Sequence, residues 1–150
     1  MKARDIMTSD PFVITEREPV SRAAEIMRDR DVGIVPVVDD RSSMRLLGVI
    51  TDRDIAIRCV ALEHGSSCMV GDHMTSAHLG TVHPDDDVST VIKLMERDRV
   101  RRIPVVSDDN RLDGVIAQAD LATKVGPSDP QKIVEILERV SAAHTVPATT

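Results

Sequence analysis

The sequence predicts a mixed α/β (α+β) fold made of two β-α-β-β-α repeats related by a pseudo-twofold axis, followed by a C-terminal helix. Three motifs carry this prediction, because each occurs twice, in the same order and at nearly constant spacing. The pairs are DIMTS at 5–9 and DHMTS at 72–76, PVVDD at 36–40 and PVVSDD at 104–109, and GVITDRD at 48–54 and GVIAQAD at 114–120. Duplicated halves of this size bury their apolar faces against each other. We therefore expect one module with paired clefts at the seam.

The length of 150 residues suits one compact domain of ordinary size. We expect the first repeat over 1–67 and the second over 68–126, which together form the module. Residues 127–150 are expected to add an amphipathic helix and a flexible tail. The hydrophobic fraction of 41% supports a real core, which must be aliphatic because Phe12 is the only aromatic residue of the Phe, Tyr and Trp class.

The elements of each repeat follow from the periodicity of their apolar residues. A short strand precedes a helix in which apolar residues recur at i, i+3, i+4 and i+7. Two β-branched runs separated by polar residues then predict a hairpin, and a second helix closes the repeat at a glycine. The expected ranges are strands at 12–15, 34–38 and 46–50 with a closing helix at 52–64, and strands at 80–83, 103–106 and 112–116 with a closing helix at 118–125.

The last predicted element is an amphipathic helix over 130–143. Its apolar face contains Ile133, Ile136, Leu137 and Val140. This face can pack on the module or on a second subunit, and the sequence leaves both possibilities open. The tail 144–150 is expected to be disordered.

Composition disfavours several classes of protein. A net charge of -6 is unlike that of a general nucleic-acid binder, although a local arginine cluster can still hold a small anion. No apolar run approaches the roughly 20 residues of a membrane span. The opening MKARDIMTSD lacks the apolar region of a secretory signal, so we expect a cytoplasmic protein.

The ordered and repeated motifs resemble those of cystathionine β-synthase (CBS) domains, and two in tandem resemble a CBS pair, or Bateman module. The resemblance covers residues 1–125 and is closest to small stand-alone CBS-pair proteins. It implies an adenosyl ligand in the cleft between the repeats: AMP, ADP or ATP, or in some members NAD or S-adenosylmethionine. It also implies a homodimer that regulates an unidentified protein partner.

The segment GVITDRD contains the first candidate binding residues. Thr51 and Asp54 are three residues apart, so they share one face of the first helical turn. A carboxylate can accept hydrogen bonds from both ribose hydroxyls, and the resemblance gives residues at these positions that role. The alternative is an ordinary N-cap with a first-turn acid. The second repeat keeps Asp120 but has Ala117 in place of the threonine, which predicts a weaker site.

A second asymmetry concerns the start of the central strand. Arg101 and Arg102 stand where the first repeat has Gly33 and Ile34, and guanidinium groups suit phosphate oxygens. The alternative is a solvated pair, or partners for Asp108 and Asp109. The resemblance implies that basic residues here contact the nucleotide whose ribose the other repeat holds. This crossed arrangement predicts one strong site and one weak or empty site.

The resemblance also implies that aliphatic side chains hold the base. The matching residues are Ile14 and Pro36, beside Val35, in the main site, and Val82 and Pro104, with Asp120, in the weaker site. Their alternative role is plain core packing, which is the favoured interpretation for Val35.

Cysteine and histidine residues cluster in sequence between the repeats. Cys59, His64, Cys68 and His73 follow the pattern C-x4-H-x3-C-x4-H, which matches no usual zinc finger. Cys59 lies in an apolar segment, where a buried thiol behaves as a small hydrophobe. We therefore expect two reduced thiols and no bound metal.

Three functions compete at this point. The favoured one is a regulatory sensor that binds an adenine nucleotide and has no chemistry of its own. The second is a scaffold with empty clefts, used for dimerisation or partner docking. An enzyme is the least favoured, because no nucleophile and base stand in a catalytic pattern.

Overall fold

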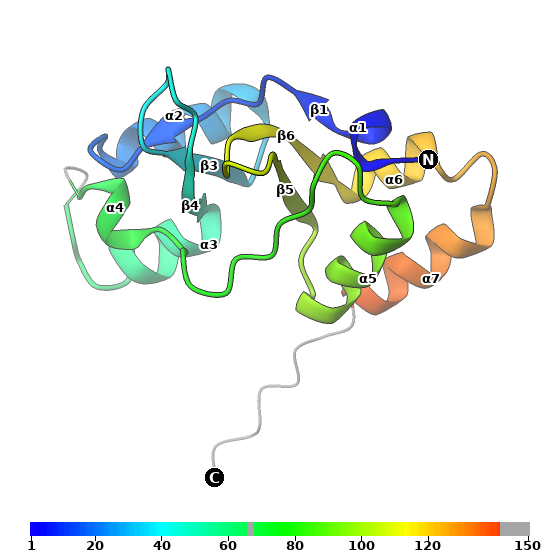
Figure 1. The fold of residues 1–150 in the computed structure, drawn as a ribbon. Coiled ribbons are helices and arrows are strands. Elements are labelled where there is room, and N and C mark those ends of the chain that lie inside the picture. Colours follow the sequence, from blue (N-terminus) through cyan, green and yellow to red (C-terminus); the bar gives the residue numbers. More distant parts are fainter. Residues whose placement is uncertain (66–67, 142–150) are drawn as a thin grey trace, which may run out of the picture.

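The computed structural model describes residues 1–65 and 68–141 and confirms the mixed α+β architecture, with two three-stranded sheets flanked by helices (Figure 1). The first half contains β2 (Ile14–Thr15), α2 (Val20–Arg30), β3 (Ile34–Val38), β4 (Leu46–Thr51), α3 (Asp52–Asp54) and a π-helix, η1 (Ile55–Val60). The second half contains α5 (Val88–Asp98), β5 (Arg102–Val106), β6 (Leu112–Ala117), α6 (Gln118–Lys124) and α7 (Pro130–Ser141). The openings of the two repeats are α1 (Ala3–Ile6) with β1 (Thr8–Ser9), and α4 (Val70–His73).

Antiparallel hairpins form the centre of each half, as predicted. β3 pairs with β4 and β5 pairs with β6, with equivalent registers and an irregularity at the same place in each. The strands expected at 12–15 and 80–83 are shorter than predicted. Only Ile14–Thr15 pairs with β3, and only Val82 bridges to β5, because the residues before them do not reach the hairpin.

The two openings are exchanged between the halves. α1 packs against α6 and β6, and β1 pairs with β6 through Thr8 and Val115. In return α4 packs against α2 and η1, and Thr75 bridges to Val49 of β4. Lys2 forms an ion pair of 2.9 Å with Asp87, at the N-cap of α5, which fastens the chain start to the second half. The repeats that are consecutive in sequence are therefore interleaved in space.

The glycine of each repeated GVI motif makes this exchange possible. A Cβ atom on Gly48 would lie 2.5 Å from the carbonyl oxygen of Thr75. A Cβ on Gly114 would lie 2.7 Å from the carbonyl oxygen of Thr8. Any side chain at either position would therefore push the exchanged opening off its hairpin.

The halves meet at the turns of their hairpins. The Leu46 N–H donates to the Asn110 carbonyl at 3.0 Å, and the Asn110 side chain donates back to the Leu46 carbonyl at 2.8 Å. A small apolar cluster lies beside these bonds and draws equally on both hairpins. Its buried members are Val38, Leu46, Val106 and Leu112.

The closing helices differ more than the sequence predicts. The second is the expected α-helix over Gln118–Lys124. The first was predicted to run to residue 64, and this was wrong. It is a short turn, α3, followed by η1, in which the Ala61 N–H donates to the Ala56 carbonyl at 2.9 Å. Such i to i+5 bonds widen the helix, which places its later residues differently from those of α6.

The C-terminal helix α7 packs on the module. It contacts α5 and α6, and its buried residues Ile133, Ile136 and Val140 join the core of the second half. The predicted apolar face is wrong at Leu137, which is 40% exposed because it lies past the edge of that contact. The tail 144–150 lies outside the described residues. None of the helices that the structure describes has the length and apolarity of a membrane span.

Candidate functional site

Asp54 is one of two buried polar side chains in the part of the chain that the structure describes, and the other is His73. Asp54 is 8% exposed and lies at the junction between β4 and the helix that follows. The Thr51 N–H donates to Asp54 Oδ2 at 3.0 Å, and the Asp54 N–H donates to Thr51 Oγ1 at 3.0 Å. This reciprocal capping box realises the local alternative for the pair, and it leaves acceptor capacity on the carboxylate.

Two further residues reach Asp54, and neither was predicted from the sequence. Thr75 Oγ1 lies 3.3 Å from each carboxylate oxygen, and Arg58 Nε lies 3.7 Å from Oδ1. Thr75 belongs to the repeated opening motif, and Arg58 follows Asp54 at the i,i+4 spacing. The repeated motif and the i,i+4 spacing were the signals available in the sequence, but only the exchange of openings brings Thr75 to Asp54. The junction is thus a polar site assembled from two distant segments.

The equivalent junction of the second half is poorer in hydroxyl groups. The Ala117 N–H donates to Asp120 Oδ2 at 2.7 Å, but Ala117 returns no bond. Lys124 Nζ lies 3.8 Å from Asp120 Oδ1 and donates to the Ile6 carbonyl at 2.8 Å. Among the described residues, Gln118 Nε2 is buried without a hydrogen-bond partner, so this junction also holds an unused donor.

The arginines lie beside the junction of their own half. Arg102 begins β5 and is paired in register with Ala117, as Ile34 is with Thr51. The Arg101 carbonyl accepts from the Gln118 N–H at 2.8 Å. Within residues 1–65 and 68–141, neither guanidinium forms an ion pair or hydrogen bond with an acid, including Asp54. In Figure 1 the end of β4 and the start of β5 lie toward the same side of the molecule.

The residues expected to hold a base are packed in the interior. Ile14 and Val82 are 0% and 3% exposed and belong to the cores of the first and second half. Pro36 and Pro104 are buried in the central strands. These four residues have the alternative role, which is core packing. Their contact with a base stays a proposal.

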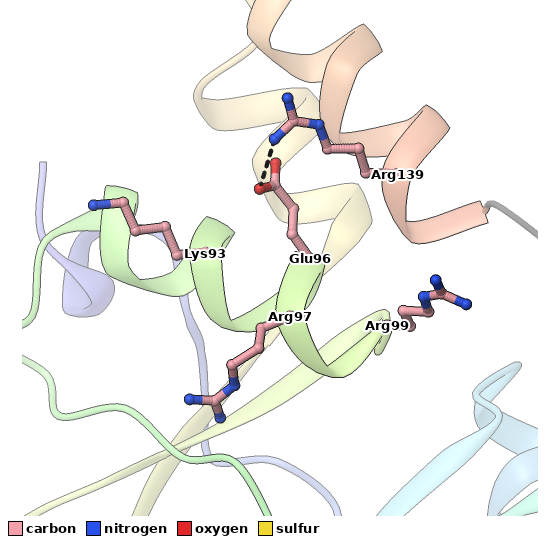
Figure 2. A pocket seen from close by; sticks show the side chains of 5 residues that line it. All are labelled: Lys93, Glu96, Arg97, Arg99 and Arg139. Carbon is pink, nitrogen blue, oxygen red and sulfur yellow. Dashed lines mark hydrogen bonds and ion pairs between the residues drawn. The ribbon is translucent and has the colours of Figure 1, made fainter.

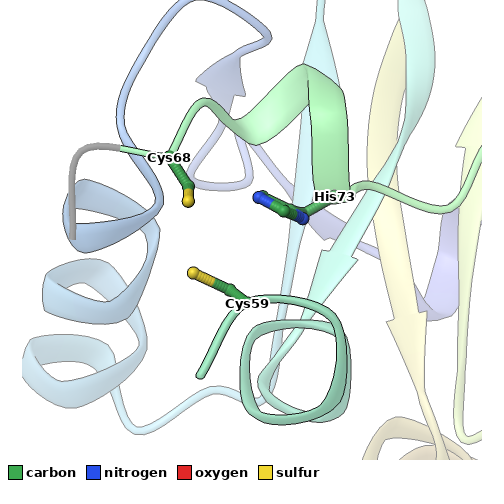
Figure 3. Close-up of side chains that lie close together, drawn as sticks. All are labelled: Cys59, Cys68 and His73. Carbon is green, nitrogen blue, oxygen red and sulfur yellow. The ribbon is translucent and has the colours of Figure 1, made fainter. Parts of the chain in front are cut away.

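The structure brings three metal-capable side chains together at the first half. The ligand atoms of Cys59, Cys68 and His73 all lie within 4.8 Å of one another (Figure 3). Cys59 comes from η1, Cys68 precedes α4 and His73 ends it. Burial, and then the neighbouring Cys59 thiol, raise the pKa of the Cys68 thiol above its ordinary value.

A basic hollow lies elsewhere, on the face shared by α5 and α7 (Figure 2). Its lining is Lys93, Glu96, Arg97, Arg99 and Arg139. Glu96 pairs with Arg139 at 3.2 Å, and the other cations spread apart rather than converge. Arg97 and Arg99 stand at the C-terminal end of α5, where cations stabilise the helix dipole. This hollow is therefore explained by helix packing.

Comparison with known proteins supports the family that the motifs suggested. A family model described as the CBS domain matches residues 3–60 and 70–126. Hypoxic response protein 1 of Mycobacterium tuberculosis is 33% identical over 120 residues, which cover 80% of this chain and 82% of that protein.

Solved structures give the same match. The crystal structure of Hypoxic Response Protein I, with two coordinated zinc ions, has a TM-score of 0.74 at 33% identity and covers 83% of this chain and 98% of that one. The CBS domain pair of protein MJ0100, in complex with 5′-methylthioadenosine and S-adenosyl-L-methionine, has a TM-score of 0.73 at 26% identity, with 85% and 98% covered. CBSX2 in complex with AMP has a TM-score of 0.72 at 25% identity, with 85% and 97% covered.

Proposed function

Because this chain belongs to the CBS domain family and carries two such domains in tandem, we propose that it is a regulatory module that binds an adenosyl ligand between its repeats. The observation that carries the proposal is the buried Asp54 carboxylate, flanked by the hydroxyls of Thr51 and Thr75. A buried carboxylate is costly unless it has partners or a task. Here its local partners leave room for ribose hydroxyls as further donors.

Each residue of the site has a role in this proposal. Asp54 accepts the ribose hydroxyls, and Thr51 and Thr75 hold its carboxylate in place. Arg101 and Arg102, which have no acid partner among the described residues, neutralise the phosphates. Ile14 and Pro36 supply the apolar contacts to the base.

The second cleft is proposed to be the weaker one. It would combine Asp120 with Val82 and Pro104, but Ala117 supplies no hydroxyl and Ile34 supplies no cation. Asp120 also has a competing cation, Lys124, at 3.8 Å. One strong and one weak site per chain follow from these differences.

The ligand class is an adenosyl compound. AMP in CBSX2, and S-adenosyl-L-methionine in the MJ0100 pair, support it. We propose AMP, ADP or ATP as the first candidates, because a pair of arginines suits a phosphate, with NAD and S-adenosylmethionine as alternatives.

We further propose that the protein acts without catalysis, as a cytoplasmic homodimer that regulates a protein partner. Exposed apolar side chains gather on and near η1 and α4, and they favour self-association. They are Ile57, Val60, Leu62 and Met69. The division of the chain into 1–67, 68–126 and 127–150 is part of the same proposal. Light scattering after gel filtration tests the dimer.

Calorimetric titration with AMP, ADP, ATP, NAD and S-adenosylmethionine tests the binding. We expect one tight site per chain, and Asp54→Ala should abolish binding there. Asp120→Ala should leave that site's affinity within about twofold. Ligand at 100 times its Kd should stabilise the fold by about 2.7 kcal/mol.

A second variant separates binding from folding. Asp54→Asn keeps an oxygen that can accept from the Thr51 N–H, so the capping box survives while the charge is lost. It should fold like the parent and bind at least tenfold more weakly. Two equal sites would contradict the asymmetry, and failure of all five ligands would favour the scaffold function.

A further inference from the structure

Three residues that the nucleotide proposal does not use lie together at the first half. Cys59 and His73 are buried, at 3% and 6% exposed, and Cys68 is half-buried beside them. The ligand atoms of the three side chains lie within 4.8 Å of one another, and Figure 3 shows them facing one common point. Two thiols and an imidazole are the ligands that Zn²⁺ prefers.

The distances are close to those of a metal site. Zinc bonds of about 2.3 Å to sulfur and about 2.0 Å to nitrogen place tetrahedral ligand atoms roughly 3.3–3.8 Å apart. The ligand atoms here are at most 4.8 Å apart, so side-chain rotations alone can bring them to these distances.

The other half of the molecule provides an internal comparison. The Val20 N–H donates to the Cys68 carbonyl at 2.6 Å, and the Val88 N–H donates to the Met1 carbonyl at 3.1 Å, so Cys68 and Met1 are equivalent. His73 ends α4 as Ile6 ends α1.

Cys59 follows Asp54 at the same spacing as Val125 follows Asp120. Met1 and Val125 line one small hollow, which places them together as well. Apolar packing accounts for Ile6, which is buried in the core of the second half, and for Val125, which packs against that core, while Met1 is 61% exposed. It does not account for two thiols and a buried imidazole at the equivalent positions.

The backbone at Cys59 also departs from the other half. Cys59 lies in η1, and its carbonyl accepts from the His64 N–H at 3.0 Å, an i to i+5 bond. η1 is a π-helix, whereas α6 is an α-helix in which an i to i+5 bond, from the Gly126 N–H to the Leu121 carbonyl at 3.0 Å, occurs at the C-terminal end. π-Turns inside helices are frequent at functional sites, and this one directs Cys59 toward α4 and brings His64 near.

We infer that Cys59, Cys68 and His73 bind one zinc ion, with His64 as the fourth ligand. The His64 ring lies 5.5 Å from the His73 ring, between centroids, which makes it the candidate for the fourth position. The ion joins η1 to the exchanged opening and holds α4 on the first half. Burial of two of its ligands makes it a structural site, closed to substrate.

Metal titration of the full chain tests this inference. Reduced protein is stripped with a chelator and titrated with Co²⁺, then with Zn²⁺. We expect one equivalent per chain, the visible bands of tetrahedral cobalt with a thiolate charge-transfer band, their loss when Zn²⁺ displaces Co²⁺, and a higher Tm with Zn²⁺. His64→Ala should weaken zinc binding at least tenfold, and unchanged affinity would overturn the assignment of His64.

Variants taken from the other half sharpen the test. Cys59→Val and His73→Ile insert the residues found at Val125 and Ile6, and each should weaken zinc binding at least a hundredfold. Cys59→Ser serves as the smaller change if Cys59→Val does not fold. His78→Ala, an exposed histidine outside the cluster, should leave the affinity unchanged.

Several outcomes would overturn the inference. One is unchanged affinity in Cys59→Ser and His73→Ile. Another is an equal loss in His78→Ala, which would indicate unspecific binding to surface histidines. A third is a protein that forms a Cys59–Cys68 disulfide and takes up no cobalt after reduction. Nucleotide binding is measured in separate titrations, so none of these results supports or contradicts the proposed function.

Discussion

The two halves of this molecule share a backbone plan but differ in polarity at equivalent places. In the first half Asp54 is surrounded by Thr51 and Thr75, while in the second half Asp120 has an alanine N–H and a lysine. Near the end of the closing helix the first half has two thiols and an imidazole, and the second has apolar side chains. The first half therefore has polar side chains at places where the second half has apolar ones, and the second half extends its apolar core with α7. Four changes test how far this contrast holds.

The largest effect is expected in α7, which only the second half carries. Ile136 is 1% exposed and belongs to the core of that half, while Leu137 is 40% exposed. Ile136→Ala should cost about 2–5 kcal/mol, as buried large-to-small changes do. Leu137→Ala, the matched control, should cost less than about 1 kcal/mol. Urea unfolding followed by circular dichroism measures both, and equal costs would contradict the packing described for α7.

The exchanged openings should be broken by a single methyl group. In Gly48→Ala the new Cβ meets the Thr75 carbonyl oxygen at 2.5 Å, so the opening must shift. Overpacking of this kind costs about 1–3 kcal/mol. Gly114→Ala should behave alike, because the Thr8 oxygen lies 2.7 Å away. Ligand binding separates the two variants, since only Gly48→Ala displaces Thr75 from Asp54, and equal binding by both would contradict that role.

Exchanging one residue between the junctions should move stability in opposite directions. Thr51→Ala removes the N-cap that accepts from the Asp54 N–H and should cost about 1 kcal/mol. Ala117→Thr should gain up to a similar amount and strengthen ligand binding in the weaker cleft. Thermal unfolding with and without ligand measures both effects. A destabilised Ala117→Thr would show that the two junctions are not interchangeable.

The smallest effect concerns an ion pair of the first half. Burial raises the pKa of Glu18, but the Thr15 N–H and Arg41, at 2.9 Å, outweigh it and leave the pKa below the ordinary value. A pKa that is lowered on folding stabilises the fold at pH values above the unfolded-state pKa of about 4.3. This stabilisation is lost as the pH falls through the folded-state pKa.

Arg41→Gln should therefore cost no more than about 1 kcal/mol at pH 7 and reduce the loss of stability on acidification. Urea midpoints between neutral and acidic pH measure this. Arg17→Gln removes an exposed arginine with no ion pair among the described residues, and it should leave the acid slope unchanged. An equal change in both variants would assign the effect to net charge.

Local spacing explains what could be predicted. The hairpins, α2, α5 and α6 lie where periodicity and turn residues placed them, since backbone bonds within a short segment fix these elements. The pairing of Thr51 with Asp54 was also readable, because three residues span one helical turn. The burial of Leu137 and the α-helical form of the segment at η1 were predicted wrongly. The contact of α7 with α5 and α6 decided the first, and the packing around η1 decided the second.

The sequence by itself determined that this chain is a duplicated α+β module and which residue of each repeat carries the junction carboxylate. The tertiary structure alone decided that the openings are exchanged, that Thr75 reaches Asp54, and that Cys59, Cys68 and His73 meet. The physical reason is the range of the interactions. Repeats and turns are recorded in neighbouring residues, whereas these three results depend on bridges such as Val49 to Thr75 between segments far apart in the chain.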